Sequence, residues 1–116
     1  MGAAMSAPVR PESLTARRPA PYTQRVPLLA AAGLTRIYAE GGERVVGVRD
    51  ATLSLEAGEL AVLAGPSGSG KTTLLNLVGL LDRPDSGRLA LLGEDVSTLD
   101  ERGRARLRRE KLGFVF

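Results

Sequence analysis

The chain has 116 residues, the size of one small domain, with charged (25%) and apolar (43%) fractions that are ordinary for a globular protein. It holds no cysteine and no histidine, which excludes a disulfide framework, a thiolate nucleophile and the commonest general base and metal ligand. The net charge of +3 is carried by residues 1–27, where four arginines face one glutamate. The balanced remainder lacks the basic face of a nucleic-acid-binding protein, so we expect no nucleic-acid partner.

Residues 1–27 are predicted to be a disordered tail. Five of the seven prolines lie there, separated by alanine, arginine and serine, so this segment has little apolar surface to bury. From Leu28 onward, apolar runs alternate with glycine turns. We therefore divide the chain into a tail, 1–27, and a folded domain, 28–116.

The first half of the domain contains four apolar runs that predict β-strands separated by turns. They are residues 28–38 (LLAAAGLTRIY), 44–48 (RVVGV), 51–56 (ATLSLE) and 60–64 (LAVLA). A glycine pair at 41–42 predicts the first turn, and EAGE at 56–59 predicts another. The run at 60–64 is continuously apolar, as expected of a strand buried on both faces.

The second half begins with a predicted helix. Residues 71–81 carry leucine and valine almost all round a helical surface, which indicates a buried helix. The sequence RPDSG at 83–87 ends this helix, and 88–93 predicts a short peripheral strand. Glu94 and Asp95 then fall in a solvated turn.

A charged helix is predicted after Asp100, which is a good N-cap residue. We expect its arginines on a solvated face, with Asp100 and Arg104 as a possible ion pair one turn apart. Contact of these arginines with anionic lipid headgroups or a membrane partner is the alternative. The final residues, LGFVF at 112–116, predict the start of a further apolar strand.

The stretch GPSGSGKTT, between the predicted strand and the predicted helix, matches the spacing G-x-x-x-x-G-K-[ST]. Glycines let the backbone curl so that N–H groups point at phosphate oxygens, and a helix N-terminus favours an anion. Lys71 would supply a full charge to the β- and γ-phosphates, and the Thr72 hydroxyl would ligate Mg²⁺. The predicted nucleotide ligands are Gly65, Pro66, Ser67, Gly68, Ser69, Gly70, Lys71, Thr72 and Thr73.

The flanks of this loop carry a family resemblance. GPSGSGKTTLLNLVGLLDRPDSGRLALLGEDVSTL and LRREKLGFVF resemble the ATP-binding subunit of ABC transporters, especially the lipoprotein-release and macrolide-export branch. The resemblance covers about Leu28 to Phe116. It implies an α/β fold of the P-loop NTPase class, namely the N-terminal part of an ABC-type nucleotide-binding domain. That part comprises an antiparallel β subdomain with the phosphate-loop strand and helix.

The resemblance also implies function. It implies ATP and Mg²⁺ as cofactors. It also places Tyr38 where such subunits carry an aromatic residue that stacks on adenine. The alternative is that Tyr38 has no ligand role and is simply a half-buried tyrosine of the strand. The implied activity is an ATPase that drives export or lipoprotein release through an integral membrane permease. The implied partners are that permease and a second ATP-binding subunit in a dimer, with the protein cytoplasmic and peripheral on the inner face of the plasma membrane.

Several family features are not in this sequence. The family has a glutamine directly after GFVF, then an LSGGQ signature, a strand ending in Asp-Glu and a switch histidine. LALLGED at 89–95 imitates that strand, but Gly93 interrupts it. We therefore assign no catalytic residue, because the catalytic glutamate and switch histidine are absent. We expect 28–116 to be a truncated domain that keeps the phosphate loop, is poorly stable alone and has negligible ATPase activity.

Two other functions stay open from the sequence. One is a different P-loop enzyme, such as a small-molecule kinase, since the phosphate loop alone is shared by many nucleotide-using enzymes. The other is a non-catalytic nucleotide binder of this length.

Overall fold

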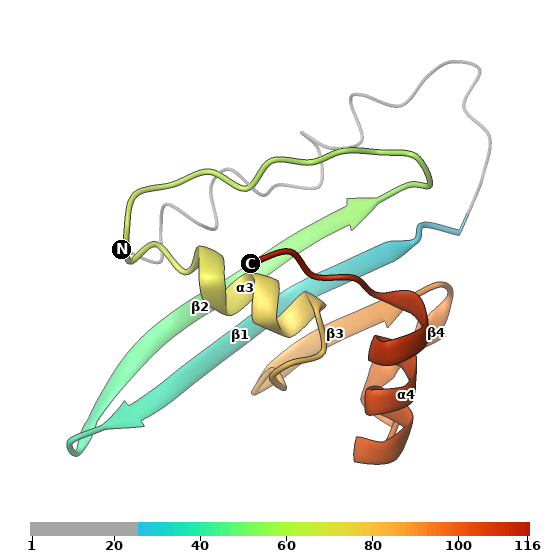
Figure 1. The fold of residues 1–116 in the computed structure, drawn as a ribbon. Helices are drawn as coiled ribbons and strands as arrows, with labels where there is room; N and C mark the ends of the chain where they lie inside the picture. Colours follow the sequence, from blue (N-terminus) through green and yellow to red (C-terminus); the bar gives the residue numbers. More distant parts are fainter. Residues whose placement is uncertain (1–25) are drawn as a thin grey trace.

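The computed structural model describes residues 26–116, which form a four-stranded antiparallel sheet with two α-helices (Figure 1). The sheet order is β2-β1-β3-β4. The elements are β1 (Leu29–Glu40), β2 (Glu43–Leu55), α3 (Lys71–Val78), β3 (Ser86–Leu91), β4 (Glu94–Asp95), the short 3₁₀ helix η1 (Val96–Thr98) and α4 (Glu101–Lys111). The predicted tail, 1–27, lies outside the described residues except for its last two.

Strands β1 and β2 form one long hairpin. Gly41 and Gly42 have φ angles of 57° and 83°, and these positive values allow the tight turn that the sequence predicted. The two short strands predicted at 44–48 and 51–56 are parts of the single strand β2. Register shifts in the pairing with β1 absorb the irregularity between them, so β2 bends without breaking.

Strand β3 pairs with the other edge of β1, which makes β1 a central strand. The strand predicted at 88–93 is thereby confirmed, with slightly earlier bounds, but it is not peripheral, because β4 pairs with its other edge. The turn lies at 92–93 and brings Glu94 and Asp95 back against β3 as the two-residue strand β4, so the prediction that these two residues form a solvated turn is wrong. Asp95 then accepts a hydrogen bond of 2.9 Å from the Ser97 N–H and caps η1, while Glu94 stays exposed.

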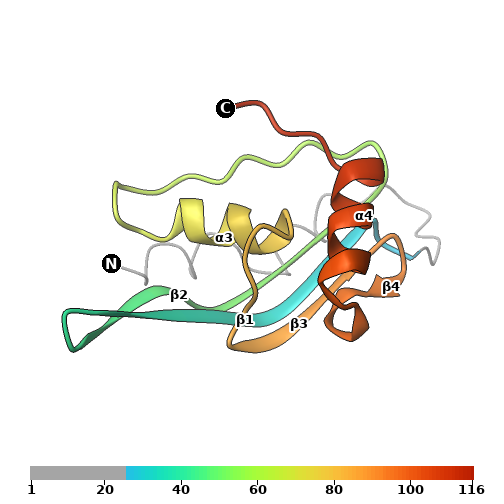
Figure 2. The same ribbon diagram turned by 60° about the horizontal axis from the view of Figure 1, so that its bottom comes forward.

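Helix α3 covers one face of the sheet (Figure 2). Within the helix, Leu74 and Leu77 are buried in the core, whereas Leu75 is 55% exposed. The helix is therefore buried on one side only. The predicted helix extended to residue 81, but it ends at Val78 because Leu80 turns the chain with a φ of 63°. Buried aliphatic side chains from the sheet, α3, the following loop and η1 make up the core: Ala31, Leu34, Val48, Ala51, Leu74, Leu77, Leu80, Leu89, Leu91 and Val96.

The prediction of a buried strand at 60–64 is wrong. This segment lies outside the sheet and runs along the side of α3 that faces away from it (Figure 2). Leu60 and Val62 are 85% and 84% exposed. An extended segment becomes a strand by hydrogen bonding to a neighbour, and within residues 26–116 no strand lies beside this one.

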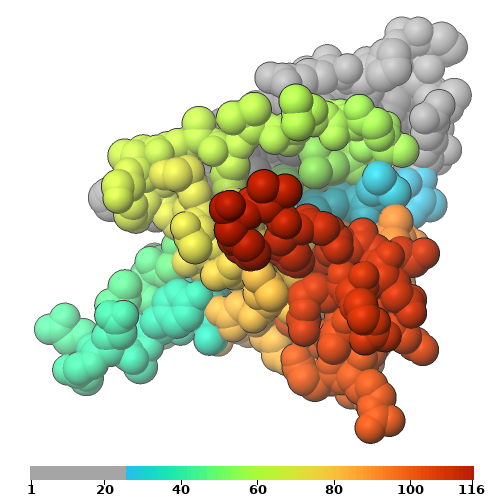
Figure 3. Space-filling view, in the orientation of Figure 1, coloured from blue at the N-terminus to red at the C-terminus, as the bar shows by residue number. Residues whose placement is uncertain are grey.

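The strand predicted at 112–116 is also absent from the structure. These residues are coil, and they lie on the molecular surface next to α3 (dark red in Figure 3). Val115 and Phe116 are fully exposed. Phe114 packs against Gly79, the C-cap residue of α3, where an added Cβ would lie 2.7 Å from the Phe114 ring.

Helix α4 begins as predicted, since the Asp100 carboxylate accepts a hydrogen bond of 2.8 Å from the Gly103 N–H. The expectation that all its arginines are solvated is wrong for Arg104, which is 2% exposed. Arg104 turns inward and donates to the Leu80 and Asp82 carbonyls, at 3.3 and 2.9 Å, in place of the expected pair with Asp100. No helix in the described part of the chain is long and apolar enough to span a membrane.

The one-sided burial of α3 can be tested by substituting one buried and one exposed leucine of the helix. We expect Leu77→Ala to cost about 2–5 kcal/mol of unfolding free energy, because it empties a fully buried site. Leu75→Ala changes the same residue type two positions away, where half of the side chain meets solvent, and should cost much less. Urea unfolding followed by far-UV circular dichroism measures both values. Equal losses would contradict the packing of α3 described above.

Candidate functional site

The loop that precedes α3 is closed by its own backbone. The Ser69 N–H donates to the Pro66 carbonyl at 3.1 Å. Gly70 then adopts a left-handed conformation, with a φ of 96°. A Cβ at Gly70 would collide with the carbonyl oxygen of Gly47 on β2. Only glycine therefore satisfies both the backbone angle and the close approach to the sheet at this position.

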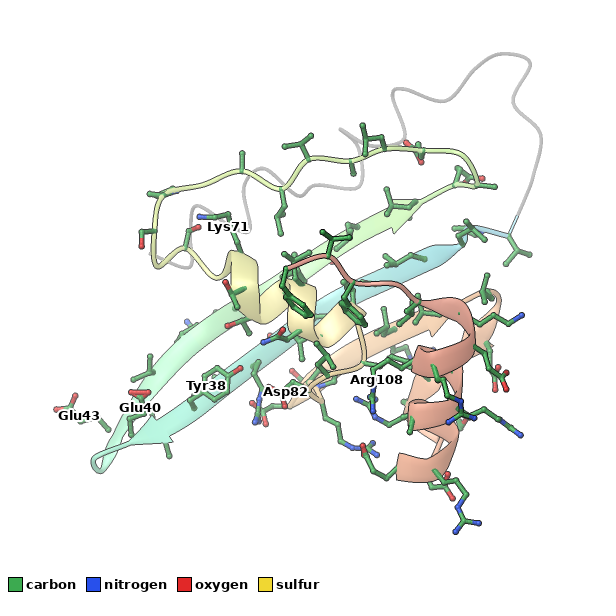
Figure 4. The ribbon with its side chains drawn as sticks, in the orientation of Figure 1. Tyr38, Glu40, Glu43, Lys71, Asp82 and Arg108 are labelled. Atoms are coloured by element: carbon green, nitrogen blue, oxygen red, sulfur yellow. The ribbon has the colours of Figure 1, made fainter. Side chains whose placement is uncertain are left out.

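The Lys71 side chain folds back over this loop (Figure 4). Its ammonium group donates to the carbonyls of Gly65 and Pro66, the latter at 2.7 Å, and to the Ser69 hydroxyl at 3.3 Å. Ser69 itself is completely buried. The positive charge is therefore held at the loop and does not project away from it.

The N-terminus of α3 adds a second source of positive potential. The first N–H groups of a helix have no partner within the helix. Gly70, as the N-cap residue, offers no side-chain acceptor to them, and the first turn contains no acidic residue. The partial positive charge of the helix end is thus unopposed and lies beside the Lys71 ammonium group.

A hollow of about 510 Å³ opens at this helix end. Its lining is polar and comes mainly from the predicted loop: Gly47, Ser67, Gly68, Gly70, Lys71, Thr72 and Thr73. The other predicted ligands, Gly65, Pro66 and Ser69, do not line the hollow and instead accept hydrogen bonds from the Lys71 ammonium group. The arrangement can bind an anion with several oxygens through N–H groups, an ammonium group and the hydroxyls of Ser67, Thr72 and Thr73.

Gly47 is a residue of this site that the sequence did not reveal. It lies on β2, far from the loop in sequence, and lines the hollow. A Cβ there would lie 2.7 Å from the Tyr38 ring and 2.9 Å from the Thr73 side chain. A glycine inside a strand pattern is the signal that could have indicated such a close approach.

The described residues contain no group of three or more acidic, histidine or cysteine side chains that could hold a metal ion. A hard cation such as Mg²⁺ binds through few protein oxygens when it also binds phosphate oxygens and water. The Thr72 hydroxyl, exposed at the hollow, is a side-chain oxygen suited to that role. This one hydroxyl fits a metal ion that is held mainly by phosphate oxygens and water.

Tyr38 lies near the end of β1, and the structure brings it to the edge of the site. Its hydroxyl donates to the Asp82 carboxylate at 3.0 Å, and the Arg36 guanidinium lies 4.7 Å from its ring centroid. The ring also flanks Gly47, beside Thr73. The half-buried ring is thus held by specific partners next to Gly47 and Thr73, although Tyr38 itself does not line the hollow.

Asp82 has a perturbed pKa. Burial raises the pKa of its carboxyl, but hydrogen bonds from the Arg83 N–H, the Arg36 guanidinium and the Tyr38 hydroxyl outweigh burial. The pKa of Asp82 therefore lies below its ordinary value. The hydrogen bond to Asp82 in turn raises the pKa of Arg36, so the pair is charged at neutral pH.

Comparisons with known proteins identify the family of the chain. Residues 48–116 match the family described as ABC transporter. The macrolide export ATP-binding/permease protein MacB of Salmonella typhi is 47% identical over 89 residues, which cover 77% of this chain and 14% of that protein. MacB of Hyphomonas neptunium is 47% identical over 90 residues, with 78% and 14% covered. The chain thus spans about a seventh of the length of these curated relatives.

A solved structure supports the same fold. The ATP-binding cassette MJ0796, in its dimeric post-hydrolysis state bound to ADP and Pi, matches with a TM-score of 0.72 at 35% identity. The match covers 76% of this chain and 38% of that chain. The antiparallel sheet with its helices is therefore the arrangement found in that cassette.

The lowered pKa of Asp82 predicts a pH dependence. A carboxylate whose folded-state pKa lies below its unfolded value of about 3.9 contributes stability above that pH, and the contribution is lost as pH falls through the folded pKa. We expect Asp82→Asn to destabilise the protein at pH 7, and the gap to the unsubstituted protein to narrow below about pH 4. Urea midpoints at pH 7 and pH 3 measure the gap, with Asp50→Asn as an exposed control. A gap that is the same at both pH values would contradict this assignment.

Proposed function

The chain belongs to the ABC transporter family, and on that premise we propose that it binds Mg²⁺-ATP through the loop Gly65–Thr73 as the ATP-binding component of a transporter. One observation carries the proposal. The Lys71 ammonium group lies at the loop and the open helix end, where it contacts the Gly65 and Pro66 carbonyls. An anion in the adjacent hollow would meet a full positive charge and several N–H groups together.

We assign the following roles to the residues of the loop. The N–H groups at the start of α3 and in the loop bind phosphate oxygens. Lys71 moves its hydrogen bonds from the carbonyls to the β- and γ-phosphates. The Thr72 hydroxyl holds Mg²⁺, which when bound neutralises part of the phosphate charge. Tyr38 offers a ring face to the adenine base at the sheet side of the site.

The second part of the proposal concerns what a full-length protein does with the bound ATP. MacB is named as an ATP-binding/permease protein, and the MJ0796 cassette is dimeric. We propose by analogy that two such ATP-binding units act together on an integral membrane permease, at the cytoplasmic face of the membrane. Binding and hydrolysis of ATP would then drive export or lipoprotein release. The residues described here serve the binding step, and we place hydrolysis in the full assembly.

A substitution of the loop lysine tests the binding step. We expect Lys71→Ala to weaken Mg²⁺-ATP binding by about tenfold or more, because a charge-assisted hydrogen bond contributes about 1.5–3 kcal/mol. Lys111→Ala removes the chain's only other lysine, at the exposed end of α4, and should leave the affinity unchanged. Isothermal titration of the 116-residue chain measures both. Equal affinities for all three proteins would refute the assignment of the loop.

A further inference from the structure

We propose that Asp82 is a positioning residue for the nucleotide base, acting by holding the Tyr38 ring at the edge of the site. The inference rests on the proposed function, because it assumes that Tyr38 faces the base of a nucleotide whose phosphates occupy the hollow. It adds a role for a residue that lies outside the phosphate loop and outside the lining of the hollow.

The contact between the two side chains is direct. The Tyr38 hydroxyl donates to Oδ2 of Asp82 at 3.0 Å, across 44 positions of sequence. The Asp82 side chain is 26% exposed, so this charge-assisted hydrogen bond is partly shielded from water. Figure 4 shows the two labelled residues close together, between the hairpin and the loop after α3.

Arg36 completes the restraint. Its Nε donates to the same Asp82 oxygen at 3.0 Å, and its guanidinium carbon lies 4.7 Å from the Tyr38 ring centroid. A cation at this distance is attracted to the face of an aromatic ring. One ring face is therefore assigned to Arg36, and a base can stack only on the opposite face.

The loop that carries Asp82 is fixed from the side of α4. Arg104 donates to the Asp82 carbonyl at 2.9 Å, and Arg108 donates to the Leu80 carbonyl at 2.6 Å. Figure 4 shows Arg108 on the side of α4 that faces this loop. These bonds hold the backbone under the carboxylate that Tyr38 uses.

The same loop is fixed to β1 on its other side. The Asp85 N–H donates to the Thr35 carbonyl at 2.8 Å, and the Ile37 N–H donates to the Asp85 carboxylate at 2.7 Å. Arg36 also bonds to Asp85, at 3.1 Å. Asp82 therefore sits in a loop restrained at both ends, which makes it a firm anchor for a side chain on β1.

The hydrogen bond from Tyr38 to Asp82 affects ligand affinity because of where the Tyr38 ring lies. A Cβ at Gly47 would overlap both the Tyr38 ring and the Thr73 side chain, so a glycine there lets the ring come close to two residues that line the hollow. A tyrosine free to rotate must lose that freedom when a base stacks on it, which costs affinity. A tyrosine already held by Asp82 avoids most of this cost. The benefit applies only to ligands that carry a base.

This selectivity is the basis of the test. We compare Mg²⁺-ATP with Mg²⁺-tripolyphosphate, which has the phosphate chain and no base, by isothermal titration of the 116-residue chain. We expect Tyr38→Phe and Asp82→Ala each to weaken ATP binding by about 2- to 10-fold, the equivalent of immobilising one side chain. Tripolyphosphate binding should stay within about twofold. Glu43→Ala, which removes a carboxylate at the hairpin tip away from the site (Figure 4), is the control.

A double substitution separates positioning from general structural support. If Asp82 acts through the Tyr38 hydroxyl, the double variant Tyr38→Phe, Asp82→Ala should bind ATP about as well as the weaker single variant. Additive losses, or equal losses for both ligands, would overturn the proposal, as would unchanged ATP binding in Tyr38→Phe. Tyr38→Phe loses only a hydroxyl, so it remains informative if Asp82→Ala fails to fold. An unsubstituted chain that binds neither ligand would instead refute the phosphate-loop function, and the positioning role would fall with it.

Discussion

The contact between α3 and the face of the β1–β2 hairpin places every part of the candidate site. Leu74 and Leu77 of the helix and Leu34 and Val48 of the sheet are buried in the same core. This apolar contact sets where the helix begins, and so where its N–H groups and the Lys71 ammonium group can meet an anion. It also fixes the position of the C-terminal end of α3 over the sheet, and so where the loop that carries Asp82 reaches β1.

The two ends of α3 perform different tasks. At the N-terminus, backbone groups and one charge form a surface suited to phosphate, and the glycines there keep side chains out of the way. At the C-terminus, Asp82 receives hydrogen bonds from Arg36 and Tyr38, and arginines of α4 bond to the carbonyls of the same loop. One short helix thereby joins an anion site to an aromatic side chain on a different element.

Apolar surface at 60–64 and 114–116 is the least expected feature of the fold. Leu60, Val62, Val115 and Phe116 are largely exposed, although their sequence patterns are those of buried strands. Burial of apolar side chains stabilises a protein only where a second layer covers them. Within the described residues, α3 has the sheet on one side and the 56–70 segment on the other, with no strands beside that segment.

Local chemistry explains what the sequence determined by itself. The glycine turn of the hairpin, the Asp100 cap, the phosphate-loop pattern and the strand after α3 depend on residues a few positions apart. Tertiary structure decided what depends on distant partners. It left 60–64 without strand neighbours, turned Arg104 inward and brought Gly47 against the loop. It also paired Tyr38 with Asp82, because hydrogen bonding and burial depend on which segments meet, and spacing along the chain does not encode that.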